Sequence, residues 1–178
     1  MSIEFTVSRE QVHLEQYYAL RERCFRRELG LEEFDGSEEE RDRQGDILVA
    51  LWEGRCVGGA RVSSRISHPR QLELLGLDSE LACMWERFAI EPGVRSLQLV
   101  PSFCASLVQF SRDSGGEHAM ILSSLRNARF YRRCHSALGV DFQIHRPVPH
   151  CASGAFAGLE HYLSVASVQE VPALQRAV

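Results

Sequence analysis

The feature that most constrains the fold of this 178-residue chain is the order in which strand-like and helix-like segments follow one another. Strand-like segments alternate apolar and polar residues, whereas helix-like segments repeat apolar residues every three or four positions. The expected order is strand, helix, two strands, short helix, strand, helix, strand, helix and two strands. No internal repeat or linker interrupts it. Such an order predicts one α/β domain, in which helices lie on the faces of a mixed sheet.

Turn and capping residues set the boundaries of these segments. The expected strands span residues 3–7, 47–53, 56–65, 85–91, 118–123, 142–146 and 159–168, and the expected helices span residues 9–29, 71–81, 97–112 and 127–138. Ser8 is the expected N-cap of the first helix, because Gln11 completes a capping-box pattern, and Gly30 is its expected end. Glu53-Gly54-Arg55 indicates a hairpin. We expect the domain to cover residues 1–168 and residues 169–178 to be a loosely held tail.

Composition argues against several classes of protein. The net charge is −4, whereas nucleic-acid-binding domains are usually strongly basic, so we expect no nucleic-acid partner. No apolar stretch has the length of a membrane span, and the N-terminus lacks a signal-peptide pattern. We therefore expect a cytoplasmic protein without a transmembrane segment. The six cysteines form no C-x-x-C pair and fit buried thiols in a reducing compartment.

Motifs for other chemistries are missing from the sequence. His145, His150 and Cys151 lie close together, but their spacing matches no standard zinc site, so we expect no bound metal. No G-x-S-x-G, Walker or H-E-x-x-H motif occurs, which leaves hydrolase, ATPase and zincin functions without support. All 20 cationic side chains are arginine, and guanidinium groups can bind carboxylates and phosphates in a bidentate way.

Arg21 lies on the apolar face of the first expected helix, one turn from both Tyr17 and Phe25. An arginine that faces a core needs a carboxylate or a phosphate there, whereas the alternative is a side chain that reaches the surface along its aliphatic stem. The acidic stretch 32–46 follows this helix and contains Asp42 and Asp46. Such a stretch is normally a solvated loop, but it could also fold back onto Arg21.

Asn127-Ala-Arg-Phe130-Tyr131, followed by Leu138-Gly139, resembles the N-x-x-x-F-Y-x-x-x-G-F type of motif of the GNAT superfamily. In that superfamily, the helix after the fifth strand carries an Asn and a Tyr beside a thioester. The expected order of elements also resembles that of the GNAT fold. The resemblance therefore implies a single-domain GNAT fold, with a mixed, mostly antiparallel sheet of about seven strands and helices on both faces.

The N-terminal half resembles a narrower group, the acyl-homoserine-lactone synthases and the related N-acyl amino acid synthases. The matching residues occur in order over residues 17–91 and comprise Leu20-Arg21, Phe25, Leu29-Gly30, Glu40-x-Asp42, Glu53-Gly54, Val57-Gly58-x-x-Arg61 and Trp85-Glu86-Arg87-Phe88-Ala89-Ile90. The W-E-x-S-R-F strand of that group is shortened here to W-E-R-F, and Leu31 and Gly45 replace its usual Trp and Asp. Residues 94–101 also lack the R-x-x-G-x-G/A loop that grips CoA pyrophosphate in ordinary GNATs, which favours a carrier-protein donor.

The resemblance implies acyl transfer from an acyl-carrier-protein or CoA thioester to the amine of an amino acid or similar small metabolite, with no tightly bound cofactor. Glu86 is then the candidate general base, and Tyr131 the candidate acid that protonates the leaving thiolate. In GNATs the oxyanion donor is usually a backbone N–H at a bulge of the fourth strand, here near residues 88–90. The alternatives are that Glu86 only pairs with an arginine such as Arg61, and that Tyr131 is a core residue.

Two sets of residues are candidates for binding. The candidate substrate-binding residues are Arg21, Phe25, Asp42, Asp46, Arg61, Arg87, Phe88 and Ile90. The candidate carrier- or cofactor-binding residues are Asn127, Arg126, Arg129, Arg132 and Arg133, since a local basic patch suits an acidic carrier protein or a phosphopantetheine phosphate. A structural ion-pair network and a solvated helical face are the alternative interpretations of the charged residues in the two sets.

Three other functions stay open at the level of the sequence. The first is an autoinducer synthase that makes an acyl-homoserine lactone from an acyl-carrier-protein donor and S-adenosylmethionine. The second is a non-catalytic GNAT-like module that binds the acyl carrier, which the shortened strand motif and the missing pyrophosphate loop would suit. The third is an ordinary acetyltransferase that acts on a protein or a small amine.

Overall fold

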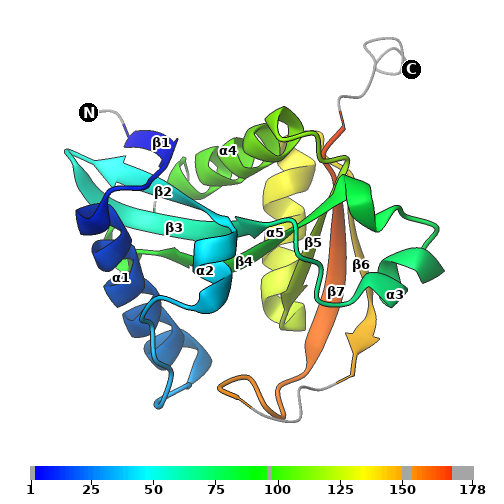
Figure 1. The fold of residues 1–178 in the computed structure, drawn as a ribbon, viewed down its shortest axis with the longest axis horizontal. Coiled ribbons are helices and arrows are strands. Elements are labelled where there is room, and N and C mark those ends of the chain that lie inside the picture. Colours follow the sequence, from blue (N-terminus) through cyan, green and yellow to red (C-terminus); the bar gives the residue numbers. More distant parts are fainter. Residues whose placement is uncertain (1–2, 96–97, 150–153, 170–178) are drawn as a thin grey trace.

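A seven-stranded sheet forms the centre of the computed structural model, which describes residues 3–95, 98–149 and 154–169 (Figure 1). In spatial order, the strands are β1 (Ile3–Val7), β2 (Asp46–Trp52), β3 (Arg55–Ser63), β4 (Ala82–Ile90), β5 (His118–Ser123), β7 (His161–Ser167) and β6 (Phe142–Val148). Strands β4 and β5 pair in parallel, and every other neighbouring pair is antiparallel. The mixed, mostly antiparallel sheet expected from the sequence is confirmed.

Helices cover both faces of this sheet. They are α1 (Gln11–Leu29), α2 (Glu40–Gln44), α3 (Pro69–Leu74), α4 (Leu99–Asp113) and α5 (Leu125–Ala137), with 3₁₀ turns η1 (Ser79–Leu81) and η2 (Pro92–Val94). The alternation along β2 explains the two covered faces, since successive side chains of a strand point to opposite sides. Val49 packs with Tyr17 of α1, whereas Leu48 and Ala50 belong to the cluster that contains Phe103 of α4. Helices α1 and α4 therefore lie on opposite faces.

The sheet opens between β4 and β5. The two strands pair only from Ala82 with His118 to Met84 with Met120. Beyond these pairs, β4 runs on to Ile90 alongside β3, and β5 runs on to Ser123 alongside β7. The two halves of the sheet therefore diverge from a short common seam, and Figure 1 shows them fanning apart. We call this divergence the β4–β5 opening.

A bulge lies in β4 beside this opening. Gly59 of β3 pairs with Ala89, but Arg61 pairs with Glu86, so β4 holds one residue more than β3 between the two pairs. Arg87 has a φ of 57°, a conformation that few non-glycine residues adopt. The extra residue shifts the alternation of side chains along the strand. As a result, Glu86 and Arg87 both face α2, whereas Phe88 contacts α4 and α5 on the other face.

Most of the expected elements are present, with shifted ends. The prediction of Ser8 as N-cap is wrong, because α1 begins only at Gln11 and its N-cap is Glu10. The Ser8 hydroxyl instead accepts a hydrogen bond from the backbone N–H of Glu10, which satisfies a turn that precedes the helix. The predicted end of α1 is correct, since Gly30 caps the helix in the left-handed conformation, with a φ of 66°.

The acidic stretch is not only a loop. It contains the short helix α2, whose N-cap Glu39 forms a reciprocal capping box with Asp42. The predicted single helix over residues 71–81 is wrong in extent, because it divides into α3 and the 3₁₀ turn η1. The hairpin between β2 and β3 is as predicted, and its loop residues Glu53 and Gly54 both have positive φ.

Within the described residues, no helix is long and apolar enough to cross a membrane. The predicted tail falls almost wholly on residues 170–178, which lie outside the described residues, as do His150 and Cys151 of the histidine-containing segment.

His135 of α5 lies buried between two aromatic rings. Its ring stacks on Trp85 of β4 and Phe142 of β6, with centroid distances of 5.2 and 5.1 Å. The Nδ1 atom hydrogen-bonds the backbone carbonyl of Tyr131, while Nε2 has no partner among the described residues. Burial lowers the pKa of His135, because a charged imidazolium would lose its hydration there.

We expect His135→Phe to reduce the acid sensitivity of the fold. Because the folded pKa of His135 is lowered, the unfolded chain binds a proton first as the pH falls below about 6.5, and stability then decreases by up to about 1.4 kcal/mol per pH unit. Denaturant unfolding at pH 8 and pH 5 measures this. The variant should gain stability relative to the native chain at pH 5, and an identical difference at both pH values would contradict the prediction.

Candidate functional site

Seven charged side chains form one connected group on the face of the sheet that α1 and α2 cover. We call it the charged cluster, and its members are Arg21, Glu39, Arg41, Asp42, Arg61, Glu86 and Arg87. They come from α1, from α2 and its N-cap, from the middle of β3 and from the bulge of β4. The cluster therefore ties the N-terminal helices to the edge of the β4–β5 opening.

Arg21 and Asp42 form the buried centre of the charged cluster. The guanidinium donates two hydrogen bonds to the carboxylate, at 3.0 and 2.7 Å, and both side chains have no exposed surface. Arg21 also donates to the backbone carbonyls of Gly36 and Ser37, which fixes the segment before α2. Of the two alternatives for Arg21, pairing with a carboxylate is therefore correct, and the acidic stretch does fold back onto it.

Arg61 connects three carboxylates. It donates to Asp42 at 2.8 Å and to Glu39 at 2.6 Å through Nη1, and to Glu86 at 3.0 Å through Nε. Its side chain is fully buried, and Nη2 has no hydrogen-bond partner among the described residues. Burial would raise the pKa of Asp42, but hydrogen bonds from Arg21 and from the backbone lower it overall, so the carboxylate stays ionised.

Glu86, the candidate base, is held by two arginines. Its Oε2 atom lies 3.0 Å from Nε of Arg61 and 3.0 Å from Nη2 of Arg41, and its side chain is 13% exposed. The pairing of Glu86 with Arg61, which was the alternative to a role as general base, is therefore present. The two arginines fix the orientation of the Glu86 carboxylate. If Glu86 acts in catalysis, it does so while it is paired with both of them.

Arg87 lies where the charged cluster meets the aromatic ring of Phe156. It pairs with Glu39 through Nε and Nη2, at 2.9 to 3.1 Å, and 22% of its side chain is exposed. The ring of Phe156, from the segment between β6 and β7, lies 4.5 Å from the guanidinium carbon. Four guanidinium groups and three carboxylates leave the cluster with one positive charge. The cluster can therefore accept an anionic group at Arg87.

Phe88 and Tyr131 meet on the opposite face, beside the β4–β5 opening. Their ring centroids are 5.5 Å apart, and Phe88 also contacts Phe103 of α4 at 5.1 Å. Burial raises the pKa of Tyr131, so its phenol stays protonated well above neutral pH. The two residues that sequence analysis placed near a thioester, one on β4 and one on the helix after β5, are thus neighbours.

Other candidate residues lie apart from the cluster. Asp46 is the first residue of β2 and pairs at the surface with Arg9. Phe25 packs in an apolar cluster with Phe34 and Phe156, and Ile90 is buried in the main core below α4. The prediction that groups Asp46 with Arg21 is therefore wrong, because the chain has already entered β2 at this residue.

The candidate carrier-binding residues share helix α5. Arg126, Arg129, Arg132 and Arg133 are all exposed, and no ion pair links them to any other described residue. Phe130 is 36% exposed and lies one helical turn from Arg126 and from Arg133. Asn127 is partly buried in the first turn, where its N–H donates to the N-cap Ser124. The helix therefore presents an exposed basic surface with Phe130 at one edge, which we call the α5 basic face.

Three residues of the site, Glu39, Arg41 and Phe156, are not among the candidates that the sequence offers. Glu39 bridges Arg61 and Arg87, but it stands between two other glutamates, and nothing in the sequence distinguishes it from them. Arg41 and Phe156 lie in segments that were expected to be loops. The reciprocal hydrogen bonds of Glu39 and Asp42 form a capping box in the structure, but Glu-x-x-Asp is not the Ser/Thr-x-x-Glu/Gln sequence that would have predicted one.

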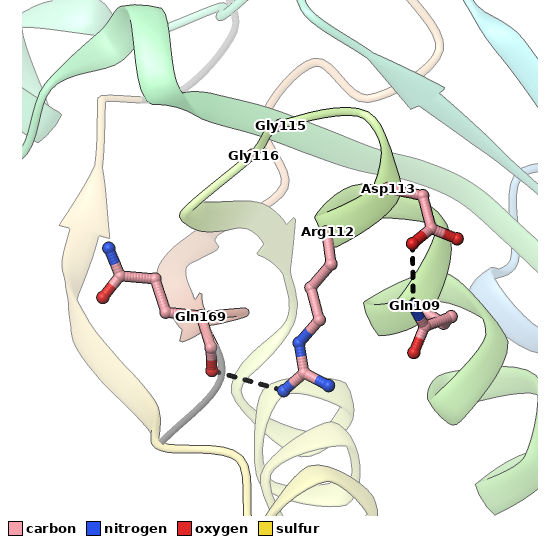
Figure 2. A pocket seen from close by; sticks show the side chains of 6 residues that line it. All are labelled: Gln109, Arg112, Asp113, Gly115, Gly116 and Gln169. Carbon is pink, nitrogen blue, oxygen red and sulfur yellow. Dashed lines mark hydrogen bonds between the residues drawn. The ribbon is translucent and has the colours of Figure 1, made fainter. Parts of the chain in front are cut away.

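Two surface hollows of about 320 Å³ each lie outside the charged cluster. One, between α1 and the turn after β4, contains the ion pairs Arg95–Glu28 and Arg23–Glu91. Figure 2 shows the other, at the C-terminal end of α4, where Arg112 donates to the backbone carbonyl of Gln169 at 3.2 Å. Arg112 thereby anchors the end of β7 to α4, which is a structural role.

Comparison with solved structures finds the same architecture in acyltransferases. The CoA-dependent acyl-homoserine lactone synthase BjaI, solved with SAM and isopentyl-CoA, superimposes with a TM-score of 0.70 and 21% identity, over 94% of this chain and 83% of BjaI. Aminoglycoside 6'-acetyltransferase type Ii superimposes with a TM-score of 0.64 and 13% identity, over 97% of this chain and 100% of the acetyltransferase. A GNAT-family structure from Desulfovibrio desulfuricans superimposes with a TM-score of 0.61 and 11% identity, over 94% of this chain and 100% of that structure.

The chain has the GNAT fold. The resemblance carried by the sequence motifs and the superposition of the whole sheet agree on this point. Neither a scan against protein-family models nor a search of curated proteins gives a match. In this GNAT fold the bulged strand is β4, and the helix after β5 carries Tyr131.

Replacing Asp42 by Asn should destabilise the fold strongly. The variant would leave Arg21 and Arg61 buried without their shared negative charge, which typically costs about 3–5 kcal/mol. Urea unfolding measures the loss. Glu38→Gln, which removes only the exposed pair with Arg43, is the matched control and should change stability by at most about 1 kcal/mol. Equal effects of the two substitutions would contradict a structural role for the buried pair.

Proposed function

We propose that this protein is an N-acyltransferase that moves an acyl group from an acyl-carrier-protein or CoA thioester to the amine of an amino acid or similar small metabolite. The observation that carries the proposal is the arrangement at the β4–β5 opening. A bulge of β4 separates the charged cluster on one face from the contact between Phe88 and Tyr131 on the other. An anionic acceptor and an apolar acyl thioester could approach the same backbone segment from these two sides.

The acceptor is recognised at Arg87 in this proposal. Its guanidinium is partly exposed, and the charged cluster has one uncompensated positive charge, so a carboxylate can bind there with its amine near the bulge. Phe156 lies against the same guanidinium and limits how an acceptor approaches it. These features favour a small amine that carries a carboxylate over a polyamine or a basic protein.

The proposed reaction is a direct attack of the amine nitrogen on the thioester carbon. A C–N bond forms, the carbonyl oxygen becomes an oxyanion that the Phe88 N–H stabilises, and the C–S bond then breaks to release the carrier thiolate. Glu86 takes the proton that the amine nitrogen loses, directly or through a water molecule. The raised pKa of Tyr131 makes its phenol a weaker acid than a thiol, so Tyr131 acts by hydrogen-bonding the departing thiolate.

Mass spectrometry of lipid extracts from cells that overproduce the protein tests this function. We expect a new N-acylated amino acid or related amine, which is strongly reduced with Glu86→Gln and with Tyr131→Phe. Removing one group that acts only in the transition state typically lowers kcat about 100-fold. Circular dichroism of both variants checks that a loss of product does not reflect unfolding.

The same extracts separate the competing functions. A lactone product would favour an autoinducer synthase, and tight binding of acetyl-CoA with transfer of an acetyl group would favour an ordinary acetyltransferase. Binding of acyl-carrier protein without a product from any amine pool would favour a non-catalytic module. The proposed function fails if no acylated amine appears, or if the two variants produce as much of it as the native protein.

We further propose that an acyl-carrier protein docks on the α5 basic face. Carrier proteins are acidic, and four exposed arginines without described ion pairs lie there beside Phe130, on the helix that also carries Tyr131. Charge attraction would bring the carrier to the helix, and the ring of Phe130 would add contact area. This arrangement would place the carrier's thioester arm close to the β4–β5 opening.

Replacing Arg126, Arg129 and Arg133 together with Ala should raise the KM for an acyl-carrier-protein donor about tenfold, since three exposed charge contacts of about 0.5 kcal/mol each amount to that factor. The KM for an acyl-CoA of the same chain length should change less. Arg55→Ala with Arg70→Ala, two exposed arginines elsewhere, is the matched control. Steady-state assays at low and high salt measure the effect, and an equal rise for both donors would argue against carrier docking.

A further inference from the structure

Tyr17 connects helix α1 to the bulge of β4. Its hydroxyl donates a hydrogen bond to the backbone carbonyl of Arg87 at 2.8 Å, across 70 positions of the sequence. The Tyr17 side chain is completely buried, and none of the interpretations above gives its hydroxyl a part in the site. This contact fixes the carbonyl oxygen of the residue in β4 that has a positive φ.

The carbonyl that Tyr17 holds shares a peptide unit with the N–H of Phe88. Peptide bonds in the described chain are trans, and in a trans peptide the C=O and N–H bonds point in opposite directions. Because the Arg87 carbonyl points toward α1, the Phe88 N–H points away from α1. The ring of Phe88 lies on that other side, in contact with Tyr131. The N–H is therefore directed toward the side of β4 on which Tyr131 lies.

The surroundings of Tyr17 keep its hydroxyl in place as a donor. Burial raises the pKa of Tyr17, so the hydroxyl stays protonated at neutral and mildly alkaline pH. Gly59 of β3 leaves room for the ring, since a Cβ at that position would lie 2.4 Å from Cδ2 of Tyr17. The Arg21 guanidinium carbon lies 5.4 Å from the centre of the same ring. The Tyr17 ring is thus held between Gly59 of β3 on one side and Arg21 of the charged cluster on another.

We propose that Tyr17 is a positioning residue for acyl transfer, whose hydrogen bond to the Arg87 carbonyl aims the Phe88 N–H at the thioester oxygen. This inference rests on the proposed acyltransferase function. Tyr17 does not touch the substrate and acts through the peptide between residues 87 and 88. A donor that is already fixed stabilises the developing oxyanion better than one that must reorient during the reaction. The contact therefore acts on the chemical step and leaves substrate binding unchanged.

Tyr17→Phe tests this role, because it removes the hydroxyl and keeps the ring. We expect kcat for acyl transfer to fall about tenfold, less than the loss of an oxyanion donor itself, with the KM values of donor and acceptor changed by less than about twofold. Single-turnover measurements with a saturating acyl thioester should show the same fall in the chemical step. The melting temperature should decrease by no more than about 5 °C.

Two further variants make the result specific. Tyr18→Phe removes the neighbouring hydroxyl on the same helix and should leave kcat unchanged. Gly59→Ala displaces the Tyr17 ring without altering the hydroxyl and should also lower kcat. If Tyr17→Phe keeps the native kcat, or raises KM instead, the positioning role is overturned while the acyltransferase function stands. If the native protein transfers no acyl group, the proposed function itself fails.

Discussion

The buried pairing of Asp42 with Arg21 and Arg61 is the interaction on which the rest of this structure depends. Removing such charges from water is unfavourable unless they are closely paired and hydrogen-bonded, and both conditions are met here. The three residues belong to α1, α2 and β3, so the pairing closes only when these elements have assembled. The segment before α2 is then held by backbone hydrogen bonds to Arg21. A stretch that would otherwise be a solvated acidic loop thus becomes part of the site.

The bulge of β4 brings the charged cluster to the edge of the β4–β5 opening. Without the extra residue, Glu86 and Arg87 would point to opposite faces of the sheet, since side chains alternate along a strand. The bulge brings both to the charged cluster and turns Phe88 toward Tyr131. The shortened W-E-R-F sequence therefore does not separate its glutamate from its arginine. The positive φ of Arg87 is the conformational strain that this arrangement requires, and Tyr17 and Glu39 hold it.

The order of elements and a mixed sheet could be predicted from periodicity, and the mostly antiparallel, seven-stranded sheet from the family resemblance. For Arg21 the sequence left two alternatives open, and the burial of its charge explains why pairing with a carboxylate is the correct one. The start of α1 was wrong, since Ser8 satisfies a capping-box pattern but bonds in a turn before the helix. Arg61 was one of the two alternatives for Glu86 and is its partner. The bulge leaves no trace in side-chain identity, so the second partner of Glu86, Arg41, and the pairing of Arg87 with Glu39 could not be derived from spacing. Phe156 comes near Arg87 only through the long connection between β6 and β7, which local patterns do not describe.

The two faces of β4 are mechanically linked through one peptide unit. On one side, the Arg87 carbonyl is held by Tyr17, whose ring lies beside Arg21 of the charged cluster. On the other side, the N–H of the same unit is directed to where Phe88 and Tyr131 meet. A change in the charged cluster that moves α1 would therefore also rotate this peptide. The charged cluster and the Tyr17 hydrogen bond both join α1 to β4, so the orientation of this N–H depends on the packing of α1 against the sheet.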